Sequence, residues 1–219
     1  FFSYFGLYTI YNINRLKNMF ENRNLIQPKK DPFLLFEEWF EEAKLKEQND
    51  PNAMNLSTIS KDLKPSSRIV LLKSFDQDGF VFYTNLQSKK GISLLSNSNA
   101  SLTFHWKSLL KQIRIEGRAH QVTSKEADDY FNSRPMESRI GAWASNQSSE
   151  LSDRQELIDK ISLYKKKFQQ NSISRPPYWT GFRVEPNLIE FWKDMPFRLH
   201  DRIEYKKTDN KWISRRLYP

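Results

Sequence analysis

The 219 residues suit one domain with short appendages, and 16 Phe and 6 Trp indicate a packed core. The absence of cysteine excludes disulfides, thiolate nucleophiles and Cys-ligated metals, and three widely spaced histidines offer no metal-ligand spacing, so any redox chemistry must come from an organic cofactor. The net charge of +9 raises nucleic acid as a partner, but the chain has no long Lys/Arg tract, and we expect no such partner.

Residues 1–30 are predicted to be an N-terminal extension, disordered or outside the fold, ahead of a single domain over 31–219. Residues 1–20 contain no acidic residue, and their apolar run is shorter than the roughly 20 residues that a membrane span needs. They are interpreted either as part of a transit peptide, which would indicate mitochondria, or as untranslated sequence ahead of a start at Met19. We favour the second interpretation and a cytoplasmic protein without a membrane partner.

One helix is predicted at the start of the domain. Asp31 supplies an N-cap carboxylate, and Pro32 suits the first helical position. An apolar stripe at helical spacing follows, opposite a row of glutamates, and consists of Phe36, Trp39, Phe40 and Ala43. The helix is expected to end before residues 49–51.

The pattern changes to strands after Met54. β-Branched and aromatic runs predict strands over 67–74, 79–85, 100–106 and 111–122. Residues 76–79 predict a hairpin turn between the first two of these strands. Residues 88–97 predict a short helix between the second and the third.

Two more helices and a second group of strands complete the domain. The helices are predicted from the capping boxes Thr123-x-x-Glu126 and Ser152-x-x-Gln155. After Pro176-Pro177 the predicted strands cover 178–184, 188–192, 199–206 and 211–217. Strands outnumber helices, and most turns are too short for parallel crossovers. We therefore predict a mainly β, α+β fold: an antiparallel β-barrel with peripheral helices.

The sharpest local motif is Ser88-Lys89-Lys90, which follows a predicted strand and opens a predicted helix. The six glycines show neither GxGxxG nor GxxxxGK spacing, and the chain has no Ser elbow or HExxH, so dinucleotide folds and P-loops are not indicated. Two lysines oppose the positive end of a helix dipole unless an anion lies among them. The motif is therefore either a phosphate-binding turn or a pair of solvated lysines.

Further basic residues occur in aromatic-rich strands and turns. Arg68 and Lys73 flank an apolar run and, five residues apart, would lie on opposite faces of a strand. Taken alone, they indicate only an edge strand with two wet ends, and the arginines at 134, 139, 198 and 202 are equally compatible with surface charges. Taken together, they match what a flat aromatic ligand with phosphate groups would require.

Four blocks resemble the signatures of the pyridoxine/pyridoxamine 5′-phosphate oxidase family. They are SRIVLLK (67–73), VFYTNLQSKK (81–90), SRPMESRIGAWASNQS (133–148) and EFWKDMPFRLHDR (190–202). The resemblance runs in order from about Asp31 to Pro219, and its most specific parts are the third block and RLHDR with the terminal RL.P. It implies a homodimeric split β-barrel that holds FMN in a cleft between subunits.

The resemblance also implies roles for individual residues. Those implied to hold FMN are Arg68, Ile69, Val70, Leu71, Tyr83, Thr84, Ser88, Lys89, Lys90, Gln112, Gln147, Ser148, Trp192 and Arg202. Those implied to grip the substrate phosphate are Lys73, Tyr130, Arg134 and Ser138. Arg198 would polarise the reacting centre and His200 would position the pyridine ring, whereas His105 and His120 are expected to be structural.

The implied reaction is the oxidation of pyridoxine 5′-phosphate or pyridoxamine 5′-phosphate to pyridoxal 5′-phosphate. A hydride would pass from the 4′ carbon to the flavin, and oxygen would reoxidise the flavin and yield hydrogen peroxide, with ammonia released from the amine substrate. One alternative is another split-barrel FMN protein such as a flavin reductase, which would lack the residues that bind the substrate phosphate: Tyr130, Arg134 and Ser138. A second is a non-enzymatic basic binding module, for RNA for example, with a steep salt dependence.

Three departures from the family pattern lie beside these positions. Lys111 precedes Gln112 where the family usually has arginine, and a lysine cannot reproduce a bidentate fork. Trp179-Thr180-Gly181 stands in place of Trp-Gly-Gly, and Lys193-Asp194 in place of Gln-Gly. We expect the function to survive all three.

Overall fold

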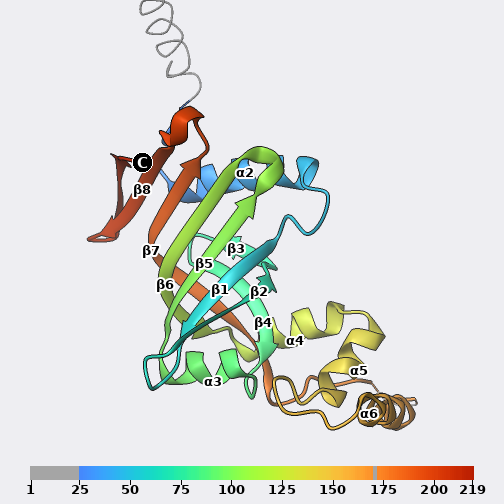
Figure 1. The fold of residues 1–219 in the computed structure, drawn as a ribbon. Coiled ribbons are helices and arrows are strands. Elements are labelled where there is room, and N and C mark those ends of the chain that lie inside the picture. Colours follow the sequence, from blue (N-terminus) through green and yellow to red (C-terminus); the bar gives the residue numbers. More distant parts are fainter. Residues whose placement is uncertain (1–24, 170–171) are drawn as a thin grey trace, which may run out of the picture. The chain divides into compact units, whose positions relative to one another are not determined.

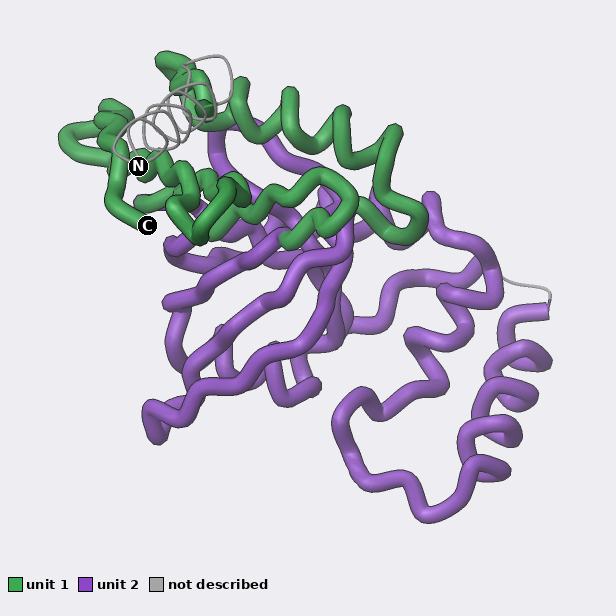
Figure 2. Tube along the Cα trace, turned by 45° about the horizontal axis from the view of Figure 1, so that its top comes forward, with its two compact units in different colours: residues 1–51, 105–114, 188–219 green, residues 52–104, 115–187 purple. Residues whose placement is uncertain are grey.

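The computed structural model describes residues 25–169 and 172–219, and the chain divides into two compact units (Figure 2). Unit 1 comprises residues 1–51, 105–114 and 188–219, and unit 2 comprises residues 52–104 and 115–187. The predicted extension lies outside the described residues as far as residue 24. None of the helices in the described part of the chain is long and apolar enough to cross a membrane.

Figure 1 labels strands β1 to β8. In chain order the strands are β1 (Ala53–Ile59), β2 (Pro65–Leu71), β3 (Ser74–Asp76), β4 (Gly79–Asn85), β5 (Asn99–Trp106), β6 (Lys111–Gln121), β7 (Trp179–Lys193), β8 (Asp201–Thr208) and β9 (Lys211–Leu217). The hydrogen-bonded order is β2-β1-β5-β6-β7-β4-β3, with β8 paired to β7 and β9 to β8. The pairings of β1 with β2 and β5, of β4 with β3 and β7, and of β8 with β7 and β9 are antiparallel, as predicted.

Unit 1 is built around α2 (Pro32–Lys46), whose N-cap is the predicted Asp31: its carboxylate accepts a hydrogen bond of 2.9 Å from the amide of Phe33. The predicted apolar stripe is buried, and Trp39 packs edge-on against Phe191 of β7 at 5.2 Å. Two 3₁₀ turns belong to this unit, η2 (Lys107–Leu109) and η3 (Pro196–Arg198). The predicted stripe thus forms part of the core of unit 1.

Residues 25–30, placed by the sequence in the extension, contact the rest of unit 1. Ile26 is buried, and its amide donates a hydrogen bond of 2.6 Å to Asp201 of β8. Arg216 of β9 pairs with the same carboxylate. The amide of Lys29 donates to the hydroxyl of Tyr205 at 2.8 Å.

Unit 2 contains four helices: α3 (Lys89–Ser96), α4 (Ser124–Ser133), α5 (Met136–Ala144) and α6 (Arg154–Lys167) (Figure 1). The capping box of Thr123 and Glu126 is present at the start of α4. The hairpin turn predicted at 76–79 joins β3 to β4. It depends on Gly79, whose φ is +134° and whose Cβ, if it had one, would lie 2.2 Å from the carbonyl oxygen of Val184.

Several predicted boundaries are wrong. The N-cap of α6 is Asp153, not Ser152; the Ser152 hydroxyl instead donates to Glu156. The strands predicted at 178–184 and 188–192 are one continuous strand, β7, because residues 185–187 remain extended. The strand predicted over 67–74 ends at Leu71, and β1 and α5 were not predicted as separate elements.

Candidate active site

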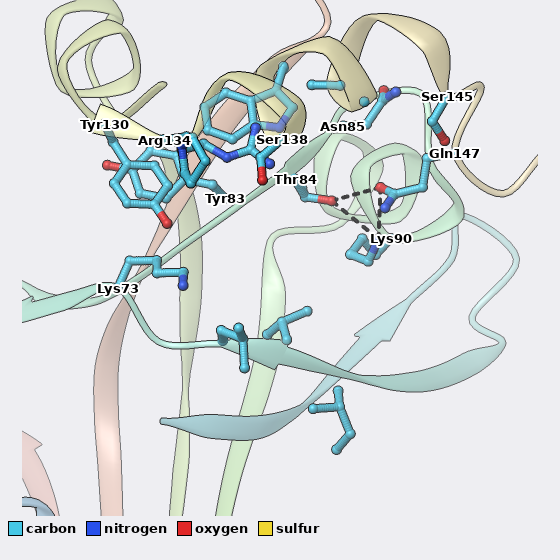
Figure 3. A pocket seen from close by; sticks show the side chains of 17 residues that line it. Lys73, Tyr83, Thr84, Asn85, Lys90, Tyr130, Arg134, Ser138, Ser145 and Gln147 are labelled. Carbon is cyan, nitrogen blue, oxygen red and sulfur yellow. Dashed lines mark hydrogen bonds between the residues drawn. The ribbon is translucent and has the colours of Figure 1, made fainter. Parts of the chain in front are cut away.

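A cavity of about 680 Å³ opens in unit 2 where β2 and β4 face α4 and α5 (Figure 3). Eleven of the predicted site residues line it: Ile69, Val70, Leu71, Lys73, Tyr83, Thr84, Lys90, Tyr130, Arg134, Ser138 and Gln147. Ten of them come from three of the four blocks that carry the family resemblance, and Tyr130 lies just before the third block. The fold therefore brings these blocks together at one pocket.

Lys90 lies at one side of this pocket, in the first turn of α3. Ser88 is the N-cap of that helix, and its hydroxyl oxygen accepts from the amide of Gly91. The Lys90 ammonium is buried, and its Nζ donates to the oxygens of Thr84 (3.2 Å), Ser88 (3.3 Å) and Gln147 (3.2 Å). Figure 3 shows Lys90, Thr84 and Gln147 linked in this way.

The surroundings of Lys90 carry no compensating negative charge: within the described structure no carboxylate pairs with its ammonium. Burial lowers the pKa of Lys90, and the nearby positive charge of Arg68 lowers it further. A buried cation whose hydrogen-bond partners are all neutral is costly unless an anion joins it. Position and charge together indicate an anion-binding site.

Arg68 does not line the pocket. Its guanidinium lies over β1, where Nη1 donates to the buried hydroxyl of Thr58 at 2.8 Å and to the carbonyl oxygen of Leu56 at 3.1 Å. Nη2 donates to the hydroxyl of Ser66 at 2.6 Å. All these partners are neutral, so Arg68 adds a second positive charge beside Lys90.

A second group of polar residues faces the pocket from α4, α5 and the segment after β2. Tyr130 and Arg134 lie at the C-terminal end of α4, Ser138 in the first turn of α5, and Lys73 extends toward them from below (Figure 3). Burial lowers the pKa of Arg134, and its Nη1 is buried without a hydrogen-bond partner. This cation too lacks a carboxylate partner among the described residues.

The wall behind this second group is aromatic. Tyr83 stacks on Tyr130 with ring centroids 4.0 Å apart and planes inclined by 15°. Tyr83 also stacks on Trp179, at 5.3 Å and 9°. Gly181 makes room for this arrangement, because a Cβ there would lie 2.7 Å from the ring of Tyr83.

The remaining predicted residues lie elsewhere. Ser88 and Lys89 belong to the start of α3 but do not line the pocket, and Lys89 is exposed. Ser148, with a φ of +71°, lines a smaller cavity of about 190 Å³ that also includes Gln147. Gln112, Trp192, Arg198, His200 and Arg202 belong to unit 1.

Within unit 1, Arg202 is held by the buried carboxylate of Glu190. Its Nε and Nη2 donate to Glu190 at 2.8 and 3.0 Å, and its Nη1 donates to the carbonyl oxygen of Tyr218 at 3.0 Å. The C-terminal RL.P segment therefore helps to fix the position of Arg202.

His200 and Arg198 occupy the turn before β8. The His200 ring lies against Trp192 with centroids 4.5 Å apart, and its Nδ1 lies 3.0 Å from the carboxylate of Asp194. Phe197 and Arg198 both have positive φ, 59° and 62°. One of the three departures, Asp194, thus touches a predicted site residue. A second, Lys111, is paired with Glu42 and lies over the ring of Trp39.

Six pocket-lining residues were not predicted: Asn85, Pro135, Gly141, Ala142, Ser145 and Trp179. Gly141, Ala142 and Ser145 recur at helical spacing after Ser138, so a prediction of α5 would have found them. Trp179 was noticed only as part of a departure from the family pattern.

Gly141 offers a direct test of how close the pocket contents come to α5. A Cβ at Gly141 would meet no atom within 4 Å. Since alanine is favoured over glycine within a helix, Gly141→Ala is expected to stabilise the ligand-free protein by about 0.5–1 kcal/mol in urea unfolding. The methyl group would occupy pocket volume, so ligand binding should weaken. A gain in stability with unchanged affinity for FMN and substrate would mean that no ligand approaches this face of α5.

Two family models match the chain: one described as pyridoxamine 5′-phosphate oxidase over residues 40–167, and one described as the pyridoxine 5′-phosphate oxidase C-terminal dimerisation region over residues 179–219. The chain belongs to the pyridoxine/pyridoxamine 5′-phosphate oxidase family. The family resemblance predicted from the sequence is therefore confirmed, and so is the prediction of an FMN-dependent oxidoreductase.

Curated relatives carry the same description along most of the chain. The pyridoxine/pyridoxamine 5′-phosphate oxidase of Caulobacter vibrioides is 53% identical over 189 residues, which cover 86% of this chain and 85% of the relative. That of Rhodospirillum rubrum is 51% identical over 195 residues, covering 87% and 97%.

Solved structures confirm the predicted fold class, an FMN-binding split β-barrel. PhzG from Burkholderia lata, solved with tetrahydrophenazine-1-carboxylic acid, superposes with a TM-score of 0.83 at 32% identity, covering 88% of this chain and 95% of that one. A pyridoxamine 5′-phosphate oxidase-related, FMN-binding protein from Nostoc punctiforme superposes at 0.69 with 13% identity, covering 88% and 100%, and supports the fold alone.

The pocket residues fit FMN. The buried ammonium of Lys90, with neutral partners and the charge of Arg68 nearby, suits a phosphate group. Next to it, the exposed side chain of Ile69 and that of Leu71 provide apolar pocket wall for a ring system. With the FMN phosphate at Lys90, the residues around Arg134 would remain available to bind a second anion.

Proposed function

We propose that this protein oxidises pyridoxine 5′-phosphate and pyridoxamine 5′-phosphate to pyridoxal 5′-phosphate with molecular oxygen. For the alcohol, one oxygen is reduced to hydrogen peroxide per product formed; for the amine, one water is also consumed and one ammonia released. The observation that carries the proposal is the presence of two cations in one pocket without carboxylate partners among the described residues: Lys90, which is buried, and Arg134, whose Nη1 is buried. A cofactor phosphate and a substrate phosphate would each be matched by one of them.

In this proposal the chain mainly binds and orients. Ser88, Lys89 and Lys90, supported by Arg68, would hold the FMN phosphate, with Thr84 and Gln147 completing the shell of Lys90. Lys73, Tyr130, Arg134 and Ser138 would hold the substrate phosphate. Bound FMN supplies the acceptor for the two electrons that the substrate loses. Holding both phosphates fixes the distance between the reacting groups, so that they meet in one bound complex and not by random encounter.

Residues that do not line this pocket have roles that the family resemblance implies. We assign Gln112, Ser148 of unit 2, Trp192 and Arg202 to FMN, Arg198 to polarising the reacting centre, and His200 to positioning the pyridine ring. The contact of His200 with Trp192 and Asp194 supports a fixed ring orientation. We further infer a homodimer, because the region 179–219 matches a model described as a dimerisation region.

The dimer leads to a prediction of linkage. If FMN is held by residues from two chains, cofactor binding must favour the dimer, and removal of FMN must weaken it. Sedimentation velocity over a dilution series is expected to show that the dimer dissociates at a lower protein concentration with FMN than without it. A monomer that binds FMN tightly at all concentrations would refute the shared site.

The proposed activity is tested by steady-state turnover in air. Wild-type protein with FMN is expected to convert both phosphorylated vitamers to pyridoxal 5′-phosphate, with one peroxide per product, and to act poorly on pyridoxine, which has no phosphate. Oxidation of a phosphate-free aromatic substrate in preference to the phosphorylated vitamers would contradict the proposal. So would flavin reduction by a nicotinamide cofactor without any vitamer turnover, as expected of a flavin reductase.

A further inference from the structure

The indole ring of Trp179 packs against the guanidinium of Arg134. The Cζ of Arg134 lies 4.9 Å from the centroid of the Trp179 ring, within the range of a cation–π contact, and 5.9 Å from that of Phe131. Trp179 is 6% exposed, so the indole face is available to Arg134 and not to bulk water. No carboxylate shares this arginine in the described parts of the chain, and its Nη1 is buried without a partner.

The indole itself is fixed from several sides. Trp179 is the first residue of β7, and its ring stacks on Tyr83 and packs edge-on against Phe131 at 5.2 Å. Its amide donates to the carbonyl oxygen of Pro176 at 3.0 Å, and its own carbonyl accepts from Arg175 at 2.6 Å. The ring is therefore a rigid support.

An aromatic support differs chemically from a carboxylate support. A carboxylate would bind the N–H groups of the arginine and neutralise its charge. An indole face contacts only the flat side of the guanidinium, so the N–H groups in its plane remain free and the positive charge is retained. Arg134 keeps its positive charge and has an unused, buried donor in Nη1, which suits a phosphate dianion.

We propose that Trp179 is a positioning residue for the substrate phosphate, acting through Arg134. The inference rests on the proposed function, in which Arg134 binds that phosphate. It assigns to Trp179 no contact with FMN or with the reacting carbon. Its consequence is selectivity for the phosphorylated vitamer, measurable in binding as well as in turnover.

The test is a double-mutant cycle on binding of pyridoxine 5′-phosphate and of pyridoxine, measured by anaerobic calorimetry on the FMN-loaded protein after its flavin has been reduced with dithionite, so that neither ligand is oxidised. Trp179→Leu is expected to weaken binding of the phosphorylated ligand by about tenfold, and Trp179→Phe, which keeps an aromatic face, by about threefold or less. Binding of pyridoxine should be unchanged in both. In an Arg134→Ala background, Trp179→Leu should have no further effect, because the residue through which it acts is gone.

Trp143 supplies the matched control. It packs against the same hydrophobic cluster, and its ring lies at a tilt to those of Tyr164 and Phe168, both at 5.7 Å. The cation over the Trp143 ring is Lys167, whereas the rings below Arg134 are those of Trp179 and Phe131. Trp143→Leu is expected to leave the preference for the phosphorylated ligand unchanged. Urea unfolding and far-UV circular dichroism of every variant verify the fold.

The outcomes separate the two proposals. Equal loss of both ligands in Trp179→Leu, or full additivity with Arg134→Ala, would overturn the positioning role. In turnover, a role in positioning predicts a raised KM for pyridoxine 5′-phosphate with kcat nearly unchanged. If the double-mutant cycle gives the expected result but the wild-type protein does not oxidise the phosphorylated ligand, the proposed function is overturned. The role of Trp179 is then still supported.

Discussion

Replacing Lys89 and Lys90 together with alanine is expected to weaken FMN binding by roughly 2–5 kcal/mol, about 30-fold to several thousand-fold, because a phosphate loses its charged partners. Most of the loss should come from Lys90, which is buried in the pocket wall, whereas Lys89 is exposed. Flavin fluorescence titrations of the two single variants and the double variant measure each contribution.

Riboflavin provides the internal control, because it lacks the phosphate. Its weaker binding should barely change in any of these variants. Lys107→Ala, at an exposed lysine outside the pocket, should leave the affinity for both flavins at the wild-type value. If the double variant retains its FMN affinity, or loses riboflavin to the same extent, these lysines do not bind the FMN phosphate.

The lowered pKa of Lys90 predicts that the stability of the ligand-free protein depends on pH. Burial lowers the pKa of Lys90 below the value of 10.5 that applies to the unfolded chain, so the folded state binds this proton less tightly. The resulting destabilisation is fully present below the folded pKa and disappears as the pH rises through that pKa toward 10.5. Lys90→Met should therefore be at least as stable as wild type at neutral pH, and its advantage should shrink at alkaline pH in urea unfolding.

Arg134→Ala is expected to raise the KM for pyridoxine 5′-phosphate by about tenfold to a hundredfold, since one charge-assisted contact contributes roughly 1.5–3 kcal/mol. The FMN content should stay close to wild type, because Lys90 and Arg134 serve different anions in the proposed site. Steady-state kinetics and the flavin-to-protein absorbance ratio measure the two effects separately.

Arg139→Ala is the matched comparison for this variant. Arg139 follows Ser138 on α5 but does not line the pocket. Its removal should change the KM far less than the removal of Arg134. Equal loss of FMN and of substrate affinity in Arg134→Ala would mean that Arg134 belongs to the cofactor site.

The sequence predicted elements best where a local interaction determines them. The Asp31-Pro32 start of α2, the Thr123 capping box of α4 and the turn at Gly79 each depend on a few adjacent residues, and all are present. The start of α6 was misplaced by one residue because Ser152 and Asp153 are both good N-caps, and Asp153 is the one whose carboxylate reaches the amide of Gln155.

Elements that depend on tertiary contacts were missed. β1 alternates between half-buried and buried residues (Met54, Leu56 and Thr58 face inward), but its polar residues hide the apolar pattern in the sequence. α5 begins at Met136, and its N-cap residue, Pro135, makes no side-chain cap, so no capping signal precedes the helix. Both elements position residues of the candidate site: β1 holds Arg68, whose charge lies near Lys90, and α5 supplies Ser138 to the pocket.

The residues of the candidate site were predicted from the family resemblance, whereas their burial and their contacts with one another come from the structure. Spacing alone could not separate Lys89 from Lys90, since neighbours in a helix point about 100° apart and only burial decides which of them faces the pocket. Nor could it identify Trp179 as the support of Arg134, because those residues are 45 positions apart and meet only through the packing of α4 on β7.

The most direct test of the whole account is the flavin spectrum during one anaerobic turnover. Protein purified with its cofactor is expected to be yellow, and pyridoxine 5′-phosphate should bleach the flavin absorbance with one pyridoxal 5′-phosphate formed per flavin. Admission of air should restore the spectrum. A protein that binds no FMN, or whose bound FMN is not reduced by either phosphorylated vitamer, would contradict the account.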